Sequence, residues 1–584
     1  MLLDQARFER LIEIGIALSA EKDTNKLMER ILLEAKDLGN ADGGSLYIRT
    51  TEDTLEFAII RNDSLELAQG GSGEEIKLPP QKMFNEDGSP NEIQIVSKAA
   101  LSGQTLNIAD AYDSAEFDFS GTMQFDQGTG YRTTSVLTVP LKNSQNEVIG
   151  VLQLLNSLDS ETGDVIAFSE EIQPLIEALA SQAAVALDNA LLIKAQEDLL
   201  SSFIALMARA VDAKSPYTGG HCERVPELTE MLTRAACGAE TGPFAEFDLT
   251  DDEWFELHIG AWLHDCGKVT TPEYVVDKAT KLETITDRIH EIRMRFEVAK
   301  REAIIACQED IIAGSGTSAV LRKELEKRLA ELDRDFEFVA ECNLGGEFMS
   351  DEQIDRVRRI SEQTWTRTLD DRIGIAREEL LRRERRPKPE LPVSEPLLAD
   401  RYDHLIHHDA VPYSADPENL YDFKMEVPEH KFNFGEIYNL CISRGTLTKE
   451  ERFKINDHIV QTIVMLESLP FPKHLSRVPE IAGGHHEKMD GTGYPKKLRG
   501  EQMSIPARIM AIADVFEALT AADRPYKSPK KLSESIRIMA HMVEDRHLDA
   551  DLFRLFLESG VYKEYADKFL LASQIDDVDT TAYH

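Results

Sequence analysis

Cysteine, basic side chains and long apolar runs are all scarce in this sequence of 584 residues. The six cysteines form no CxxC pair, which argues against a thiolate zinc site or a disulfide framework and fits a reducing cytoplasm. With 65 Lys and Arg against 105 Asp and Glu, the net charge is −40, so nucleic-acid binding is not expected. No window approaches ~20 uncharged apolar residues, and the first residues do not resemble a signal peptide. We therefore expect a cytoplasmic protein without membrane contact.

The chain is globular in composition, with 42% apolar and 29% charged residues, and its length predicts about two to four domains. Residues 1–167 combine two helical stretches with apolar runs typical of strands, and Asn143–Asn146 marks a hairpin between two of them. The helical stretches are 3–20 and 24–39, and the strand-like runs are 45–48, 55–60, 136–140 and 148–155. We predict an α+β multi-domain protein that begins with an α/β domain.

A long connecting helix is predicted over residues 168–199. Its small and apolar residues recur at alternating spacings of four and three, which is the seam along which two helices pack. Those residues are Ile172, Ile176, Leu179, Ala183, Ala186, Ala190 and Ile193. The same pattern also fits a helix that packs within one chain. We favour a homodimer, because the helix runs between two domains.

Residues 200–274 and 436–548 are predicted to be mostly helical, and 549–584 form a C-terminal extension. Between them, residues 275–435 are richer in charge and contain the helical spacing of Ile285, Ile289, Ile292 and Phe296. We interpret this segment as an inserted helical hairpin or three-helix arm with an irregular return. A charge-rich helical surface is usually a solvated face, and a contact surface for partners is the alternative.

Imidazoles and carboxylates recur in the helical parts at positions typical of metal ligands. His264 and Asp265 end an apolar run, and such an adjacent pair can reach two metals at once. Lys268 lies three residues after Asp265 and projects from about the same helix face, where it could meet a phosphate oxygen. Asp514 interrupts an apolar helix, where an unpaired carboxylate is costly to bury. Two ions held by such groups could hydrolyse a phosphodiester.

These motifs resemble the HD-GYP phosphodiesterases, bacterial enzymes that hydrolyse cyclic di-GMP. The resemblance covers about 200–274 and 440–530 and rests on His221, HDCGK at 264–268, HH at 485–486, DGTGYP at 490–495 and Asp514. It implies a helical bundle with iron or manganese in a central cleft. The implied metal ligands are His221, His264, Asp265, His458, His485, His486 and Asp514, and the implied substrate contacts are Lys268, Tyr494, Arg524 and Lys527.

The assignment of His458 rests on the residues before it. The family has a histidine on a helix that opens with leucine, threonine and an acidic pair, and LTKEERFKINDH ends at His458 in that way. His290 lacks this context, so we interpret it as part of the insertion. His404, His407 and His408 are interpreted as surface residues of a return loop.

Residues 1–167 resemble a GAF domain, a small-molecule sensing fold. The resemblance rests on SLYIR, FDQGTGYRTTSVLTVPL and NEVIGVLQLLNS. No cysteine lies in 1–200, which excludes thiol attachment of a bilin. A ligand-binding sensor and a GAF domain used only for dimerisation both remain open.

The resulting hypothesis is a GAF-regulated, metal-dependent phosphodiesterase that hydrolyses cyclic di-GMP to pGpG. The alternatives are a non-catalytic cyclic dinucleotide receptor and the same hydrolysis of a hybrid cyclic GMP-AMP. We expect two divalent metal ions, because Tyr217 stands where some family members have the glutamate that binds a third.

Overall fold

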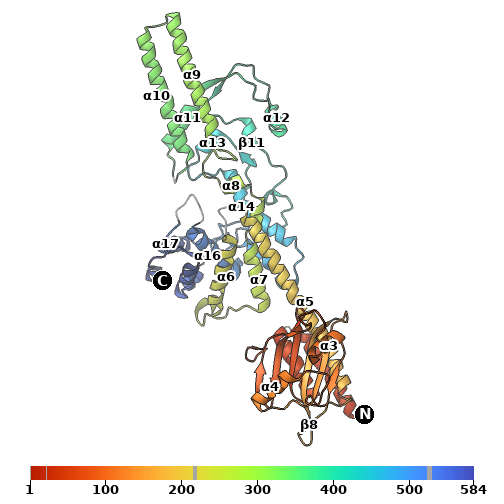
Figure 1. Ribbon diagram of the computed structural model, residues 1–584. Helices are drawn as coiled ribbons and strands as arrows, with labels where there is room; N and C mark the ends of the chain where they lie inside the picture. The colour runs from red at the N-terminus through yellow and green to blue at the C-terminus, as the bar shows by residue number, and fades with distance from the viewer. Residues whose placement is uncertain (1, 22, 215–219, 347, 523–528, 584) are drawn as a thin grey trace. The chain divides into compact units, whose positions relative to one another are not determined.

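The computed structural model describes residues 2–21, 23–214, 220–346, 348–522 and 529–583. Its internal contacts divide the chain into two compact units, Met1–Leu200 and Ser201–His584. The first unit combines a sheet with helices, and the second is mainly helical (Figure 1). The predicted α+β class is confirmed.

The first unit is built on an antiparallel sheet in the order β3-β2-β1-β7-β6-β5, with β4 on β2 and β8 on β7. The predicted hairpin joins β6 to β7: the Asn143 N–H donates to the Glu147 carbonyl at 2.9 Å, and Asn146 takes a left-handed φ of 65°. The strands are β1 (Ala41–Arg49), β2 (Thr54–Asn62), β3 (Leu67–Gln69), β4 (Gln81–Lys82), β5 (Leu106–Ile108), β6 (Val136–Lys142), β7 (Val148–Leu158) and β8 (Val165–Ile166).

Alternate side chains of the strands enter separate cores on the two faces of this sheet. Leu46 packs with α1 (Leu2–Ala20), α2 (Thr24–Leu38) and α5 (Gln173–Asp212). The next residue, Tyr47, packs with α3 (Ile95–Ser102) and the residues before α4 (Ser120–Thr129). On this second face, a cavity of about 520 Å³ lies among side chains that include Phe57, Gln94, Phe125 and Tyr131.

Helix α5 differs from the predicted dimer seam in its first half. Ile176, Leu179 and Ala183 are fully buried in the core beside the sheet, so these residues already have a partner within the chain. Ile193 is 58% exposed. Among the described residues, α5 is the one helix whose length and composition would allow it to cross a membrane, and a single such helix is weak evidence of a span.

The second unit has a helical core formed by segments from before and after the insertion. Phe516, Phe556, Tyr562 and Tyr565 are fully buried there, so the predicted C-terminal extension contributes to this core. Its helices are α6 (His221–Cys237), α7 (Asp251–Leu263), α15 (Val478–Gly483), α16 (Ile505–Thr520), α17 (Leu532–Glu544), α18 (Ala550–Glu558) and α19 (Val561–Phe569).

Helix α14 (Lys449–Glu467) packs closely against the turn at Cys266–Thr270. A Cβ atom at Gly267 would lie 2.0 Å from the His458 carbonyl oxygen, so only glycine allows this approach. The Gly267 N–H also donates to the Thr462 hydroxyl at 2.9 Å. The two segments that flank the insertion are thereby brought together.

The insertion contains a helical hairpin of α9 (Ile289–Ala313) and α10 (Ser318–Asn343), which lie side by side in Figure 1. Gly314 ends α9 with a φ of 70°, a left-handed conformation that glycine adopts readily. A third helix, α11 (Asp351–Ser361), packs at its base, and two short strands, β9 (Thr364–Arg367) and β10 (Val393–Pro396), pair in the return segment. Ile285 is 91% exposed and precedes α9, so its predicted place on the helical seam is wrong.

Candidate metal centre

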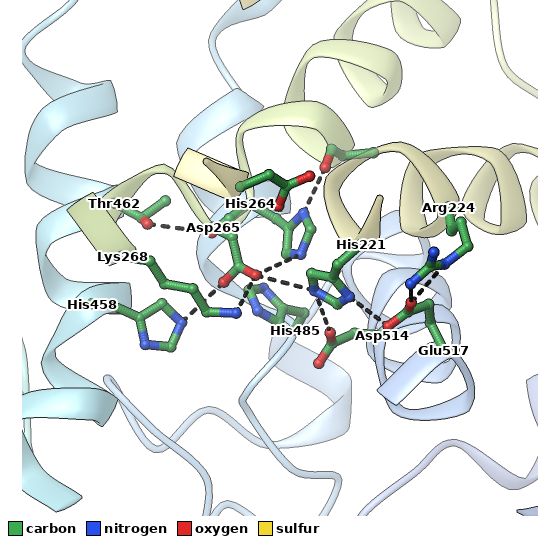
Figure 2. Close-up of polar contacts among 12 residues, drawn as sticks. His221, Arg224, His264, Asp265, Lys268, His458, Thr462, His485, Asp514 and Glu517 are labelled. Carbon is green, nitrogen blue, oxygen red and sulfur yellow. Dashed lines mark hydrogen bonds and ion pairs between the residues drawn. The ribbon is translucent and has the colours of Figure 1, made fainter. Parts of the chain in front are cut away.

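Imidazoles and carboxylates from several elements converge at one buried place (Figure 2). They come from the start of α6, the end of α7, the middle of α14, the turn after α15 and the middle of α16. The residues are His221, His264, Asp265, His458, His485, His486 and Asp514, and they are the predicted metal ligands. None of them lies in the predicted insertion.

Asp265 lies at the middle of this cluster, with its two carboxylate oxygens facing different histidines. Its Oδ2 is 3.1 Å from Nε2 of His221 and 3.3 Å from Nε2 of His264. Its Oδ1 is 3.2 Å from Nε2 of His458. The cluster accordingly contains two groups of ligand atoms, His221–His264–Asp265 and His458–His485–His486, each within 4.8 Å.

Three of the histidines are oriented by the same local hydrogen bond. The Nδ1–H groups of His264, His458 and His485 donate to the carbonyl oxygens three residues before them, at 2.7, 2.5 and 2.8 Å. The opposite atoms, Nε2 of all three, are buried and make no hydrogen bond, and neither does Oδ1 of Asp265. Where Nε2 of His264 and His458 approaches Asp265, a nitrogen without a proton faces a carboxylate oxygen. Buried polar atoms normally have a partner, and a metal ion would supply one here. The residues present therefore fit a metal.

The ionisation of these groups also suits metal binding. Burial opposes the charged form of Asp265, yet the Lys268 ammonium and the neighbouring imidazoles hold the pKa of this carboxyl well below its usual range. Burial, together with the proximity of His264, lowers the pKa of His485 to about 3. Burial and His485 likewise depress the pKa of His486. At neutral pH Asp265 is thus ionised, and His485 and His486 are neutral, as metal binding requires. The pKa of His221 differs: burial opposes its charged form, but the Glu517, Asp265 and Asp514 carboxylates raise this pKa well above its usual range.

Lys268 and Tyr494, two of the predicted substrate contacts, lie at this cluster. The Lys268 ammonium contacts Oδ2 of Asp265. The Tyr494 ring stacks on His486, with ring centroids 4.9 Å apart. A Cβ atom at Gly493 would lie 2.4 Å from the backbone nitrogen of Lys488, so the glycine allows the loop to fold tightly. Buried Glu487 holds the same loop by accepting from the backbone of Lys496 at 2.7 Å.

Sequence reasoning missed Glu517, which orients His221. Its Oε2 accepts from Nδ1 of His221 at 2.5 Å, and its Oε1 accepts two bonds from Arg224 at 2.8 and 2.6 Å. Burial opposes its ionisation, but His221 and Arg224 lower the pKa of Glu517 to about 2. The available signal was its position three residues after Asp514, about one turn along an apolar helix.

The other histidines that we considered lie elsewhere. Exposed His290 contacts Arg293 at 2.6 Å. The His407 ring lies against that of His430 at a tilt of 38°, and His408 contacts the Pro428 carbonyl at 2.9 Å. Within the described part of the chain, neither His290 nor the return-loop histidines His404, His407 and His408 belong to a metal-like group. The predicted substrate residues Arg524 and Lys527 lie outside the described residues, as does Tyr217.

Comparisons with known proteins agree with both units. Residues 23–187 match the GAF domain family, and residues 392–552 match the HD domain family. A GAF domain of an Acinetobacter phosphoenolpyruvate-protein phosphotransferase is similar at 13% identity and a TM-score of 0.23, covering 32% of this chain and 97% of that one. The chain contains a GAF domain followed by an HD domain.

Among curated proteins, the chain is 48% identical over 116 residues to 3′3′-cGAMP-specific phosphodiesterase 1 of Vibrio cholerae. It is 44% identical over 86 residues to a cyclic di-GMP phosphodiesterase of Pseudomonas aeruginosa. These matches cover 20% and 15% of this chain, and 26% and 20% of the two relatives.

Proposed function

We propose that this chain is a metal-dependent phosphodiesterase that hydrolyses cyclic di-GMP to linear pGpG, under regulation by its GAF domain. The observation that carries the proposal is the convergence of five histidines and two carboxylates from both sides of the insertion. Their unsatisfied Nε2 atoms around Asp265 support a ligand set rather than a structural cluster.

Two divalent ions, iron or manganese, are proposed as the cofactors. The two groups of ligand atoms support two positions, and Asp265 faces both through separate oxygens. Imidazoles with carboxylates and no thiolates suit these metals. When bound, such a pair activates water and stabilises the attacking and leaving oxygens of a phosphodiester.

The chain's own residues have distinct roles in this reaction. Asp265 and Asp514 supply fixed negative charge, and the imidazoles present Nε2 lone pairs because their Nδ1 protons are held by carbonyls. The Lys268 ammonium would neutralise a phosphate oxygen beside Asp265. Water oxygen bonds to phosphorus, the P–O3′ bond breaks, and the 3′ oxygen leaves as a hydroxyl after gaining a proton.

Hydrolysis of 3′3′-cGAMP is the second candidate, because a relative named for that specificity is the more similar of the two at 48% identity. The deciding experiment is metal analysis of anaerobically purified protein, followed by turnover of both cyclic dinucleotides. We expect bound iron or manganese and faster turnover of cyclic di-GMP. Metal and dinucleotide binding without turnover would instead support a receptor.

Accumulation of pGpG is expected during turnover. Tyr217 stands where some members of the resembled family have a glutamate that binds a third metal. With two metals, one fewer cation is available to hold the second phosphate for cleavage to GMP. Chromatography of the products over time tests this. Rapid conversion to GMP, or three firmly bound metals per chain, would contradict it and direct attention to Asp212 and Glu223.

We propose a homodimer through α5, in which the contact lies in the second half of the helix instead of the buried first half. Leu192, Leu199 and Leu206 recur every seven residues and are 55%, 58% and 61% exposed. Replacing Leu199 and Leu206 with lysine should convert a dimer to a monomer in light scattering, and a monomeric wild type would contradict the proposed dimer.

The GAF cavity of about 520 Å³ supports a small-molecule regulator.

A further inference from the structure

A groove of about 950 Å³ begins at Tyr494, the same ring that stacks on His486 of the metal centre. One part of its wall comes from α14, the preceding segment 437–448 and the loop at 492–497. The insertion supplies the rest, through Arg358 of α11 and through Asp400 and residues 424–426 of its return segment. We call this feature the basic groove.

The basic groove has an excess of positive charge. Its basic residues are Arg358, Lys424, Arg444, Lys449, Arg452 and Lys497, and its acidic residues are Asp400 and Glu426. Six cations minus two acids leave +4, on a chain whose net charge is −40. The local field therefore opposes that of the whole protein.

Among the described residues, most of these cations lack an anionic partner. Arg358 is 3.3 Å from Asp355, and Lys424 is 3.0 Å from Asp422. In the part of the chain that the structure describes, the other four form no ion pair with a carboxylate; they are Arg444, Lys449, Arg452 and Lys497. Gathering like charges at one place is unfavourable, and an anionic ligand would offset it.

The groove also contains aromatic surfaces. Tyr438, Phe453 and Tyr494 contribute to its walls. Aromatic rings interspersed with cations are the combination that binds phosphodiester-linked nucleotides, since rings stack on bases and cations meet phosphates. A purely inorganic anion would not need the rings.

We propose that the basic groove is an extension of the active site that binds the anionic cyclic dinucleotide, with the insertion supplying part of it. This inference rests on the proposed function, whose substrate it captures. The insertion thereby has a role in substrate affinity, although it supplies no metal ligand.

Packing holds the insertion's part of the groove in place. Phe423 is buried against Ile459, Val460 and Ile463 of α14. The backbone N–H of Lys424 donates to the Pro495 carbonyl at 2.7 Å, which ties the return segment to the loop of Tyr494. Lys424 and Lys497 consequently reach the groove from adjacent segments whose backbones are fixed.

The first test reverses two exposed charges on α14, in the variant Lys449→Glu/Arg452→Glu of the full chain. Lys473→Glu/Arg537→Glu is the control, because it changes the charge equally at exposed positions outside the groove. We expect KM for cyclic di-GMP to rise at least about tenfold in the groove variant at low salt. The kcat and metal content should be unchanged, and added salt should reduce the difference. Equal KM values in the two variants would overturn the proposal.

A second test addresses the insertion. Lys424→Glu should raise KM, whereas Lys431→Glu should not, because Lys431 pairs with Asp409 and does not line the groove. An unchanged KM both in Lys424→Glu and in Arg358→Glu would show that the insertion has no part in substrate binding.

Failure of the proposed function can be separated from failure of this inference. If wild-type protein turns over no cyclic dinucleotide, the groove is tested by equilibrium binding instead. The affinity of the chelator-treated full chain for cyclic di-GMP is measured for wild type, the α14 variant and its control. Weaker binding by the α14 variant than by its control would support the groove alone. Equal binding by both, or none by wild type, would overturn it.

Discussion

The metal centre and the basic groove share Tyr494 as a neighbour but are built in opposite ways. The centre is buried, and its ligands come only from segments that flank the insertion. Three of its histidines donate Nδ1–H to backbone carbonyls of their own segment. The groove is lined by exposed cations from both the flanking segments and the insertion. Because different residues build the two sites, mutations should change metal binding and substrate affinity separately.

The largest effect is expected from Asp265→Ala, because both groups of ligand atoms would lose their shared carboxylate. Hydrolysis should fall by at least about 10³-fold, and metal content should fall with it. Metal analysis and turnover of cyclic di-GMP measure the two effects. Asp251→Ala, at the exposed start of helix α7, which ends two residues before Asp265, is the matched control. Full activity of Asp265→Ala would refute the assignment of the centre.

Lys268→Ala should reduce turnover by about 10²-fold while the protein keeps its metal, because the ammonium neutralises charge without being a ligand. Single-turnover kinetics with metal analysis of the same sample distinguish the two outcomes. Loss of metal in a folded variant would contradict a substrate role for Lys268.

Glu517→Gln should weaken metal affinity by about 10–100-fold, because the amide no longer offers His221 and Arg224 a charged acceptor. Competition with a chelator measures the affinity. Glu564→Gln, on the exposed surface of α19, should leave it unchanged. Equal affinities would mean that Glu517 serves only the packing of α16.

The smallest effect is expected from shortening the hairpin, with residues 300–330 replaced by a short linker. Metal content, kcat and KM should all remain, since this segment reaches neither site. Replacing 283–430 should also preserve metal but raise KM, because Arg358 and Lys424 are lost. Metal loss in a folded 283–430 variant would instead implicate His290 or the histidines at 404–408.

Local patterns predicted local structure well. The hairpin at Asn143–Asn146 formed because a turn with Asn146 in the left-handed conformation separates two apolar strands. Helix α14 begins where Thr448 and Glu451 form a capping box. The predicted preference for His458 over His290 agrees with their positions, one in the cluster and the other exposed.

Periodicity did not identify the partner of an apolar face. Ile176 and Leu179 follow a heptad, but the sheet of their own domain covers them. A repeat of 3.5 residues indicates that one face of a helix is buried. The same repeat arises whether a sheet or a second helix covers that face. Replacing Ile176 and Leu179 with lysine would therefore test the stability of the GAF domain, not its dimerisation.

By itself, the sequence determined the donor types, the glycines that allow close approach and the ends of the helices, because each depends on a residue and its near neighbours. Only the tertiary structure decided that Glu517 orients His221 and that Lys424 and Lys497 line the same groove. These partners lie far apart in the chain, and one sequence contains no measure of distance in space. The physical reason is that packing of helices and loops, rather than local propensity, places them together.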